Sequence, residues 1–201
     1  MNRKALIITL LALSALVSSC KENTGTSVDT ASSSQIIPLE IGNQWIYKNV
    51  YYDSLGAITF DALDTVTIIK DTTISGEKWF RLQGSVGYSF DVIHRADGYY
   101  YYGDGGAILQ YKYPANLNER YQTYVATPTD TMVVASFNSV TTVQAGTYTC
   151  YQYNRFVPSR PTVRQTTWIE AGKGIIKEEA YGGTTTVFLS SRAELVGRNL
   201  K

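Results

Sequence analysis

The sequence has few of the residues that build disulfide frameworks, metal centres and nucleophilic active sites. It contains two cysteines, Cys20 and Cys150, and one histidine, His94. Zinc and redox motifs need cysteines or histidines in close groups, and a disulfide framework needs several cysteine pairs. We therefore expect no bound metal, no cofactor and no disulfide scaffold in this chain.

An excess of charge of one sign is also missing, as is an apolar run of membrane-spanning length. The chain has 18 lysines and arginines against 17 aspartates and glutamates. Surfaces that bind nucleic acid are basic, so this balance predicts no nucleic-acid partner. The longest apolar run, residues 5–17, is shorter than the about 20 residues that a transmembrane helix needs.

The first twenty residues have the three parts of a secretory signal peptide. Arg3 and Lys4 precede the apolar residues 5–17, "ALIITLLALSALV", and small residues follow. The sequence "VSSC", which ends at Cys20, resembles the bacterial lipobox, whose cysteine receives a diacylglycerol before the chain is cut in front of it. The resemblance implies a signal peptide at residues 1–19 and a lipid on Cys20. Two or more acyl chains anchor a protein stably in a membrane.

The residues behind Cys20 indicate a location and a tether. In enterobacteria, lipoproteins that stay in the inner membrane have aspartate directly after the acylated cysteine, and this chain has Lys21 there. We therefore expect a lipid-anchored protein of the cell envelope at the outer membrane, on its periplasmic or surface face. Residues 21–35, "KENTGTSVDTASSSQ", are polar and rich in serine and threonine, which predicts a disordered tether. The ends of such a coil lie about 20 Å apart on average. Residues 20–35 therefore form the predicted membrane-proximal unit.

Residues 36–195 have the composition and spacing of an all-β domain. Segments such as "AILQYKY", "TMVVASF" and "GTYTCYQY" are rich in valine, threonine and tyrosine, and turn signals such as "GDGG" and "AGKG" separate them. The segments recur about every ten residues, which predicts roughly 9–12 strands in a single antiparallel sheet. Because "TMVVASF" is apolar on both faces, we expect a strongly curved sheet or half-barrel. Only "NLNERYQTY", residues 116–124, favours a helical turn or two, and residues 196–201 are predicted to be a C-terminal tail.

The residues with catalytic potential do not combine into a catalytic site. Cys150 is expected in the middle of a strand, where a free cysteine usually behaves as a small apolar group, and His94 is expected on an apolar strand face. Glycosidase chemistry needs two acids that converge across a cleft. The neighbours Glu178 and Glu179 instead point to opposite faces of a strand. We expect a protein that binds a ligand and is not an enzyme.

The densest aromatic stretch, "GYYYYGDGG", supplies the candidate ligand-binding residues. Alternation in a strand places Tyr99 and Tyr101 on one face and Tyr100 and Tyr102 on the other. One pair is expected to join the core. The other pair, together with tyrosines of the next strand, could form an exposed platform for sugars, peptides or lipid headgroups. The other interpretation, which we favour, is cross-strand pairing that stiffens a hairpin. The candidate residues are Tyr99, Tyr100, Tyr101, Tyr102, Tyr111 and Tyr113.

Three short motifs, in order along the chain, resemble a recurrent, uncharacterised type of bacterial lipoprotein that is frequent in Bacteroidota. They are "IGNQWIY", "VQAGTY" and "WIEAGKG". The matching positions are Gly42, Asn43, Trp45 and Tyr47, then Val143, Ala145, Gly146, Thr147 and Tyr148, then Trp168, Gly172, Gly174 and Lys177. This type looks like the curved half-barrels of periplasmic lipoprotein carriers and related lipid-binding lipoproteins. Those proteins hold acyl chains on an apolar concave face closed by helices, whereas this sequence has no clear covering helices.

These observations lead to one functional expectation and one alternative. The expectation is a membrane-anchored envelope lipoprotein whose non-catalytic β domain binds lipid or another apolar ligand. This requires an internal apolar cavity of roughly 300 Å³ or more. The alternative is a surface-exposed module that recognises glycans or proteins through its tyrosine-rich hairpins. This requires Tyr100, Tyr102 or their partners to be exposed in one cluster.

Overall fold

The computed structural model describes residues 34–103, 105–123, 130–158, 162–183 and 185–201, which contain twelve β-strands and no helix. The predicted all-β fold is confirmed. Residues 1–19, Cys20 and nearly all of the predicted tether lie outside the described residues. The strands are β1 (Gln44–Tyr52), β2 (Ile58–Ile74), β3 (Glu77–Gly84), β4 (Ser89–Arg95), β5 (Gly98–Gly103), β6 (Gly106–Lys112), β7 (Arg120–Thr123), β8 (Asp130–Val143), β9 (Gly146–Phe156), β10 (Val163–Glu170), β11 (Gly174–Gly182) and β12 (Phe188–Asn199).

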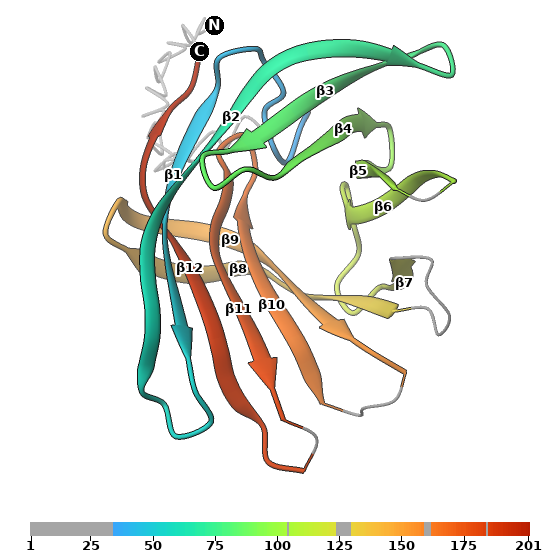
Figure 1. Cartoon of the computed structure of the whole chain (residues 1–201). Coiled ribbons are helices and arrows are strands. Elements are labelled where there is room, and N and C mark those ends of the chain that lie inside the picture. The colour runs from blue at the N-terminus through green and yellow to red at the C-terminus, as the bar shows by residue number, and fades with distance from the viewer. Residues whose placement is uncertain (1–33, 104, 124–129, 159–161, 184) are drawn as a thin grey trace, which may run out of the picture. The chain divides into compact units, whose positions relative to one another are not determined.

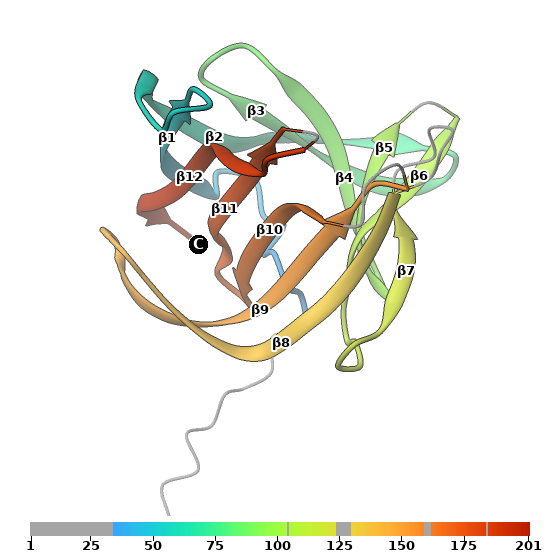
Figure 2. The same ribbon diagram turned by 90° about the horizontal axis from the view of Figure 1, so that it is seen from below.

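All twelve strands belong to one antiparallel sheet in the order β6-β5-β4-β3-β2-β1-β12-β11-β10-β9-β8-β7. The chain therefore forms two consecutive meanders, β1 to β6 and β7 to β12, and the pairing of β1 with β12 joins them. The sheet wraps into a nearly closed barrel shape, so that its two edge strands, β6 and β7, face each other (Figures 1 and 2). No helix of the described residues is long and apolar enough to cross a membrane.

Irregular pairing bends the long strands. The register shifts once between β1 and β12, once between β2 and β3, and twice between β8 and β9. An extra residue in one strand of a pair bends that strand and increases its twist. Met132, Val133 and Val134 of the bent strand β8 are all buried, which agrees with the expectation from "TMVVASF". The helical turn expected in residues 116–124 is wrong, because Arg120–Thr123 pair with β8 as strand β7.

The short segment of residues 34–43, which precedes β1, packs inside one end of the curved sheet. Ile36 is fully buried, and the backbone N–H of Ile36 donates to Nε2 of His94 on β4 at 3.1 Å. The backbone N–H of Gly172, in the β10–β11 turn, donates to the carbonyl oxygen of Gln35 at 3.0 Å. The segment thus spans the interior between two distant parts of the sheet. The core of the domain begins at residue 36, where the sequence changes from polar to apolar.

The C-terminal residues belong to the sheet, which corrects the predicted domain end at residue 195 and the predicted tail of residues 196–201. Strand β12 runs to Asn199, which pairs with Gln44, and Arg198 pairs with Trp45. The backbone N–H of Lys201 donates to Oδ1 of the buried Asn43 at 2.9 Å. Residues 196–201 show no alternation from which a strand could be inferred, yet Gly197, Arg198 and Asn199 pair with β1.

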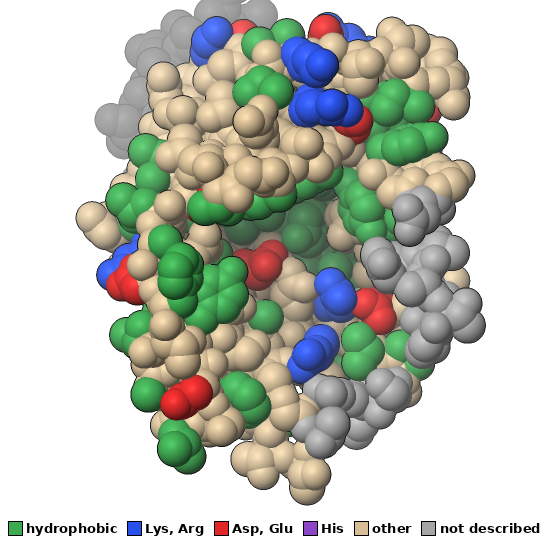
Figure 3. All heavy atoms as spheres, in the orientation of Figure 1, with side chains coloured by type: hydrophobic (Ala, Val, Ile, Leu, Met, Phe, Trp, Pro, Cys, Tyr) green, Lys and Arg blue, Asp and Glu red, His purple; other side chains and the backbone are tan. Residues whose placement is uncertain are grey.

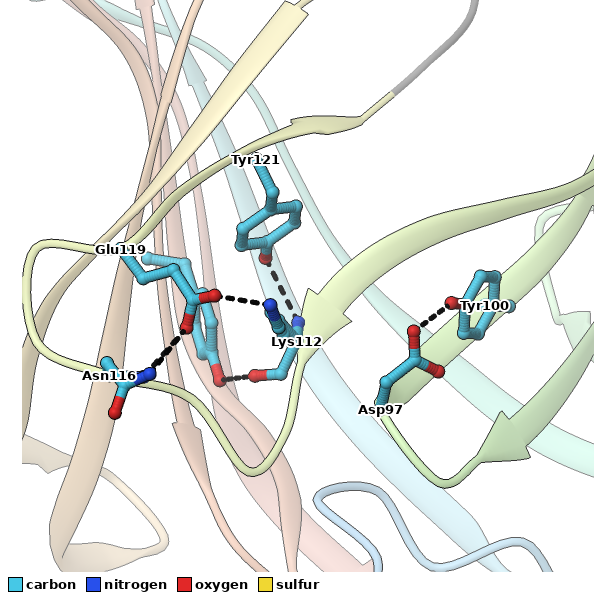
Figure 4. Close-up of polar contacts among 7 residues, drawn as sticks. Asp97, Tyr100, Lys112, Asn116, Glu119 and Tyr121 are labelled. Carbon is cyan, nitrogen blue, oxygen red and sulfur yellow. Dashed lines mark hydrogen bonds and ion pairs between the residues drawn. The ribbon is translucent and has the colours of Figure 1, made fainter.

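Side chains connect the two edge strands at the seam of the sheet (Figure 4). The Tyr121 hydroxyl on β7 accepts the backbone N–H of Lys112 at 3.1 Å and donates to the carbonyl of Gln110 at 2.9 Å, both on β6. The Tyr153 hydroxyl donates to the Lys112 carbonyl at 2.8 Å, and the Lys112 ammonium pairs with Glu119. Tyr121 thereby supplies β6 with the donor and acceptor that a neighbouring strand would otherwise provide.

Candidate functional site

A pocket of about 650 Å³ lies inside the curved sheet. It opens on the face shown in Figure 3, where hydrophobic side chains gather at the depth of the hollow. Its volume is within the range of roughly 300–1,000 Å³ that is typical of small-molecule sites. The lining residues are Ile37, Trp45, Tyr47, Asn49, Tyr51, Asp64, Val66, Leu82, Val86, Tyr88, Phe90, Tyr99, Tyr101, Gln110, Tyr111, Gln165, Ile175, Glu178 and Ala193.

The deep wall of the pocket is made of aromatic rings whose polar atoms bond elsewhere in the protein. Nε1 of Trp45 donates to the carbonyl of Lys173 at 2.7 Å, and the Tyr47 hydroxyl donates to the carbonyl of Ile175 at 3.0 Å. Both bonds reach from β1 to the region where β11 begins. Burial raises the pKa of the Tyr47 hydroxyl well above its ordinary value, so it stays neutral. These rings therefore turn apolar surface toward the pocket.

The mouth of the pocket carries exposed apolar side chains. Four lining residues are exposed to solvent, namely Val86 by 63%, Tyr51 by 47%, Tyr88 by 40% and Phe90 by 37%. Tyr88 stacks on Phe90 with ring centroids 5.9 Å apart, and Tyr51 contacts Phe60 edge to face at 5.8 Å. Apolar side chains that gather on a surface usually mark a place where a ligand or partner binds. Here they form an apolar path from solvent into the pocket.

Two carboxylates line the pocket, and they differ in how they are bonded. Asp64 accepts three hydrogen bonds: from the backbone N–H and the hydroxyl of Ser85, each at 2.9 Å, and from the Tyr88 hydroxyl at 2.6 Å. Its acceptor capacity is largely used within the protein. Glu178 on β11 receives the Thr167 hydroxyl at 3.4 Å, and burial raises the pKa of its carboxyl group. Glu178 is therefore the carboxylate that is available to a ligand.

Sequence reasoning missed Glu178 as a pocket residue. Glu178 was considered only together with Glu179, and the two were rejected as a catalytic pair, because neighbours in a strand point to opposite faces. Glu179 lies on the outer face, where it forms ion pairs with Lys177 at 2.9 Å and Arg192 at 3.0 Å. The alternation of β11 carries the missing signal, because it places Glu178 on the same face as the fully buried Ile176.

The structure divides the six candidate tyrosines into two groups. Tyr99, Tyr101 and Tyr111 line the pocket, and Tyr113 is buried close to them in the core. Tyr111 and Tyr113 therefore do not extend an outer platform, because Tyr111 lines the pocket and Tyr113 is buried in the core. Only Tyr100 and Tyr102 remain on the outer face.

The outer tyrosines are held by neighbouring side chains. The Tyr100 hydroxyl donates to Asp97 at 2.7 Å (Figure 4), and the Arg95 guanidinium lies 4.8 Å from the centre of its ring. Burial, followed by the Asp97 hydrogen bond, raises the pKa of Tyr100 to about 12. Tyr102 is 40% exposed and contacts Trp79 edge to face at 5.4 Å. These contacts attach both tyrosines to neighbouring residues of β3, β4 and the β4–β5 turn.

Cys150 and His94 have separate partners. Cys150 is fully buried, as expected of a small apolar group, and burial raises the pKa of its thiol to about 12 despite a hydrogen bond with Thr141. His94 accepts the backbone N–H of Ile36, and burial lowers its pKa. Within the part of the chain that the structure describes, no group of three or more His, Cys, Asp or Glu side chains could hold a metal ion.

The three sequence motifs meet around the β10–β11 turn and have structural roles. A Cβ atom on Gly174, whose φ is +95°, would lie 2.8 Å from Nε1 of Trp45. The Lys173 ammonium lies 5.6 Å from the centre of the Tyr148 ring, and the Tyr148 hydroxyl donates to the carbonyl of Ala145 at 2.9 Å. The motif residues thus hold β1, the β8–β9 turn and β11 together at one end of the sheet.

Comparison with known proteins gives a limited result. No family model matches the chain, and no curated protein matches it. Among solved structures, a "putative lipoprotein" of Parabacteroides distasonis is 12% identical with a TM-score of 0.44, and the alignment covers 83% of this chain and 99% of that one. A "putative exported protein with YmcC-like fold" of Bacteroides fragilis is 12% identical with a TM-score of 0.48, over 82% of this chain and 98% of that one.

Proposed function

We propose that this chain is an outer-membrane lipoprotein of the cell envelope, anchored through acylated Cys20, whose β domain binds an apolar ligand inside the curved sheet. The anchor is supported by the signal-peptide pattern and the "VSSC" sequence. The pocket of about 650 Å³ carries the ligand-binding part of the proposal. Its walls are aromatic and aliphatic, and its mouth is apolar. Apolar walls with a few placed polar groups are the usual composition of a small-molecule site.

The proposed role is non-catalytic. Cys150 is buried with a raised pKa and lies apart from the pocket lining. Two acids line the pocket, Asp64 and Glu178. Asp64 is held by hydrogen bonds from Ser85 and Tyr88, so only Glu178 is available to a ligand. Recognition of glycans or proteins through Tyr100 and Tyr102 has less support, since the Tyr100 hydroxyl is engaged with Asp97.

A fluorescent apolar probe tests the pocket. The full-length lipoprotein, held in a non-ionic amphipol, is titrated with 1-aminoanthracene. We expect saturable binding in the wild type and a loss of at least about tenfold in affinity in Ala193→Trp, because Ala193 lines the pocket and an indole there would fill it. Glu194→Trp is the matched control, since the next residue of β12 faces outward, where its carboxylate lies near Lys177 and Arg192. Equal binding by wild type and Ala193→Trp would contradict the proposal.

The anchor is tested by metabolic labelling. Cells that express the chain are grown with labelled palmitate, and the wild type is compared with Cys20→Ser. We expect label in the wild type only, and retention of the wild type in the outer-membrane fraction. Label that persists in Cys20→Ser would show that the lipid is attached elsewhere.

A further inference from the structure

The charges of the pocket restrict the ligand, provided that the pocket has the proposed function. Among the residues that the structure describes, the lining contains two carboxylates, Asp64 and Glu178, and no lysine, arginine or histidine. An anionic ligand such as a fatty acid would meet no cationic partner in the lining. It would also bring a further negative charge close to two carboxylates, and like charges repel.

Glu178 lacks the partners that acids elsewhere on the sheet have. Its neighbour Glu179 pairs with Lys177 and Arg192, whereas no ion pair among the described residues includes Glu178. The Arg155 guanidinium acts on Glu178 only at longer range, and it is already paired with Asp130 at 2.8 Å. A partly buried carboxylate without a cation is costly, so a cationic group that reached it would gain a favourable interaction.

The groups around Glu178 suit a cation. The rings of Tyr47, Tyr88 and Tyr111 line the same pocket as Glu178, and they come from β1, the β3–β4 turn and β6. The side chains of Gln165 and Thr167 on β10 donate to it. Aromatic faces attract ammonium groups, and the attraction is greater where water is excluded. A carboxylate among aromatic rings therefore provides both components of an amine site.

We infer that the pocket binds a cationic amphiphile, a molecule with an apolar body and a primary or substituted amine, whose ammonium group pairs with the Glu178 carboxylate. The apolar body lies along the aromatic and aliphatic wall that includes Trp45 and Leu82. Asp64 contributes negative potential without direct pairing, because its oxygens are occupied by Ser85 and Tyr88. The ligand enters through the apolar mouth.

Three ligands with the same twelve-carbon chain test this inference: dodecylamine, dodecanol and dodecanoate. Each displaces 1-aminoanthracene from the full-length lipoprotein in non-ionic amphipol at pH 7.5, with protein-free amphipol as the blank. We expect dodecylamine to bind at least about tenfold more tightly than dodecanol, and dodecanoate to bind most weakly. Glu178→Gln should remove the advantage of the amine. Glu179→Gln, which changes the outward-facing neighbour, should keep it.

The possible outcomes separate the inference from the proposed function. Equal affinity for the three ligands, or a preference for dodecanoate, would overturn the inference and leave apolar binding intact. An amine preference that survives in Glu178→Gln would also overturn it. Failure of all three ligands and of the probe to bind would overturn both. An amine preference that is lost in Glu178→Gln alone would support both.

Discussion

The seam between β6 and β7 gives a prediction whose size follows from two hydrogen bonds. In Tyr121→Phe the ring stays in place, but the Lys112 N–H loses its acceptor at 3.1 Å and the Gln110 carbonyl loses its donor at 2.9 Å. Removing one partner of a buried hydrogen bond costs about 1–3 kcal/mol. Because the seam is only partly buried, we expect a loss of about 2 kcal/mol in the free energy of unfolding.

For a domain of this size, each kcal/mol shifts the thermal midpoint by about 2–4 °C, so the expected decrease is about 4–8 °C. The measurement is urea and thermal unfolding followed by tryptophan fluorescence. Tyr100→Phe is the matched control, because it removes an exposed hydroxyl bond to Asp97 and keeps the ring beside Arg95. It should change stability by less than about 0.5 kcal/mol. Equal effects of the two variants would refute the idea that Tyr121 closes the sheet.

Three further predictions concern the core. Gly174→Ala should lower the free energy of unfolding by more than about 1 kcal/mol, because φ is +95° and Trp45 Nε1 blocks the new methyl group. Gly76→Ala, also at positive φ but in open space, should lower it less. Chemical denaturation compares the two variants. Burial lowers the pKa of His94 below its unfolded value of about 6.5, so its contribution to stability is complete above that pH and is lost as the pH falls through the folded pKa. The fall in urea midpoint between pH 7.5 and 5 should therefore be smaller in His94→Gln than in the wild type. Equal falls in the two proteins would contradict this. Cys150 should resist iodoacetamide until the protein is unfolded, as mass spectrometry of the intact chain would show; rapid labelling of the folded protein would contradict its burial.

The fold could be predicted from local patterns, because a meander places neighbouring segments side by side. Tyrosine- and valine-rich segments between glycine turns were enough to infer about the observed number of strands. The end of β12 could not be inferred, because Arg198 and Asn199 are ordered by their pairing with β1, which is distant in the sequence. Tyr121 was expected near a helical turn, and the pairing of β7 with the next strand, β8, makes it part of a strand.

The site was predictable only in part. Strand alternation correctly separated Tyr99 and Tyr101 from Tyr100 and Tyr102, but it could not show which pair faces inward. Tyr111 was expected in a platform with the outer pair, whereas it lines the pocket. Glu178 escaped notice because the significance of an acid on an inner face depends on which strands surround it. The closure of the whole sheet decides that, and it depends on pairs of strands that are distant in the sequence, such as β1 with β12.

The central claim is that the interior of the sheet holds an apolar ligand, and native mass spectrometry tests it most directly. The full-length lipoprotein is purified from its own membranes, and its intact mass is recorded with and without collisional activation. We predict a complex of one chain with one small apolar molecule, which is released on activation and absent from Ala193→Trp. A mass that corresponds to the acylated polypeptide alone, in both proteins, would contradict the claim.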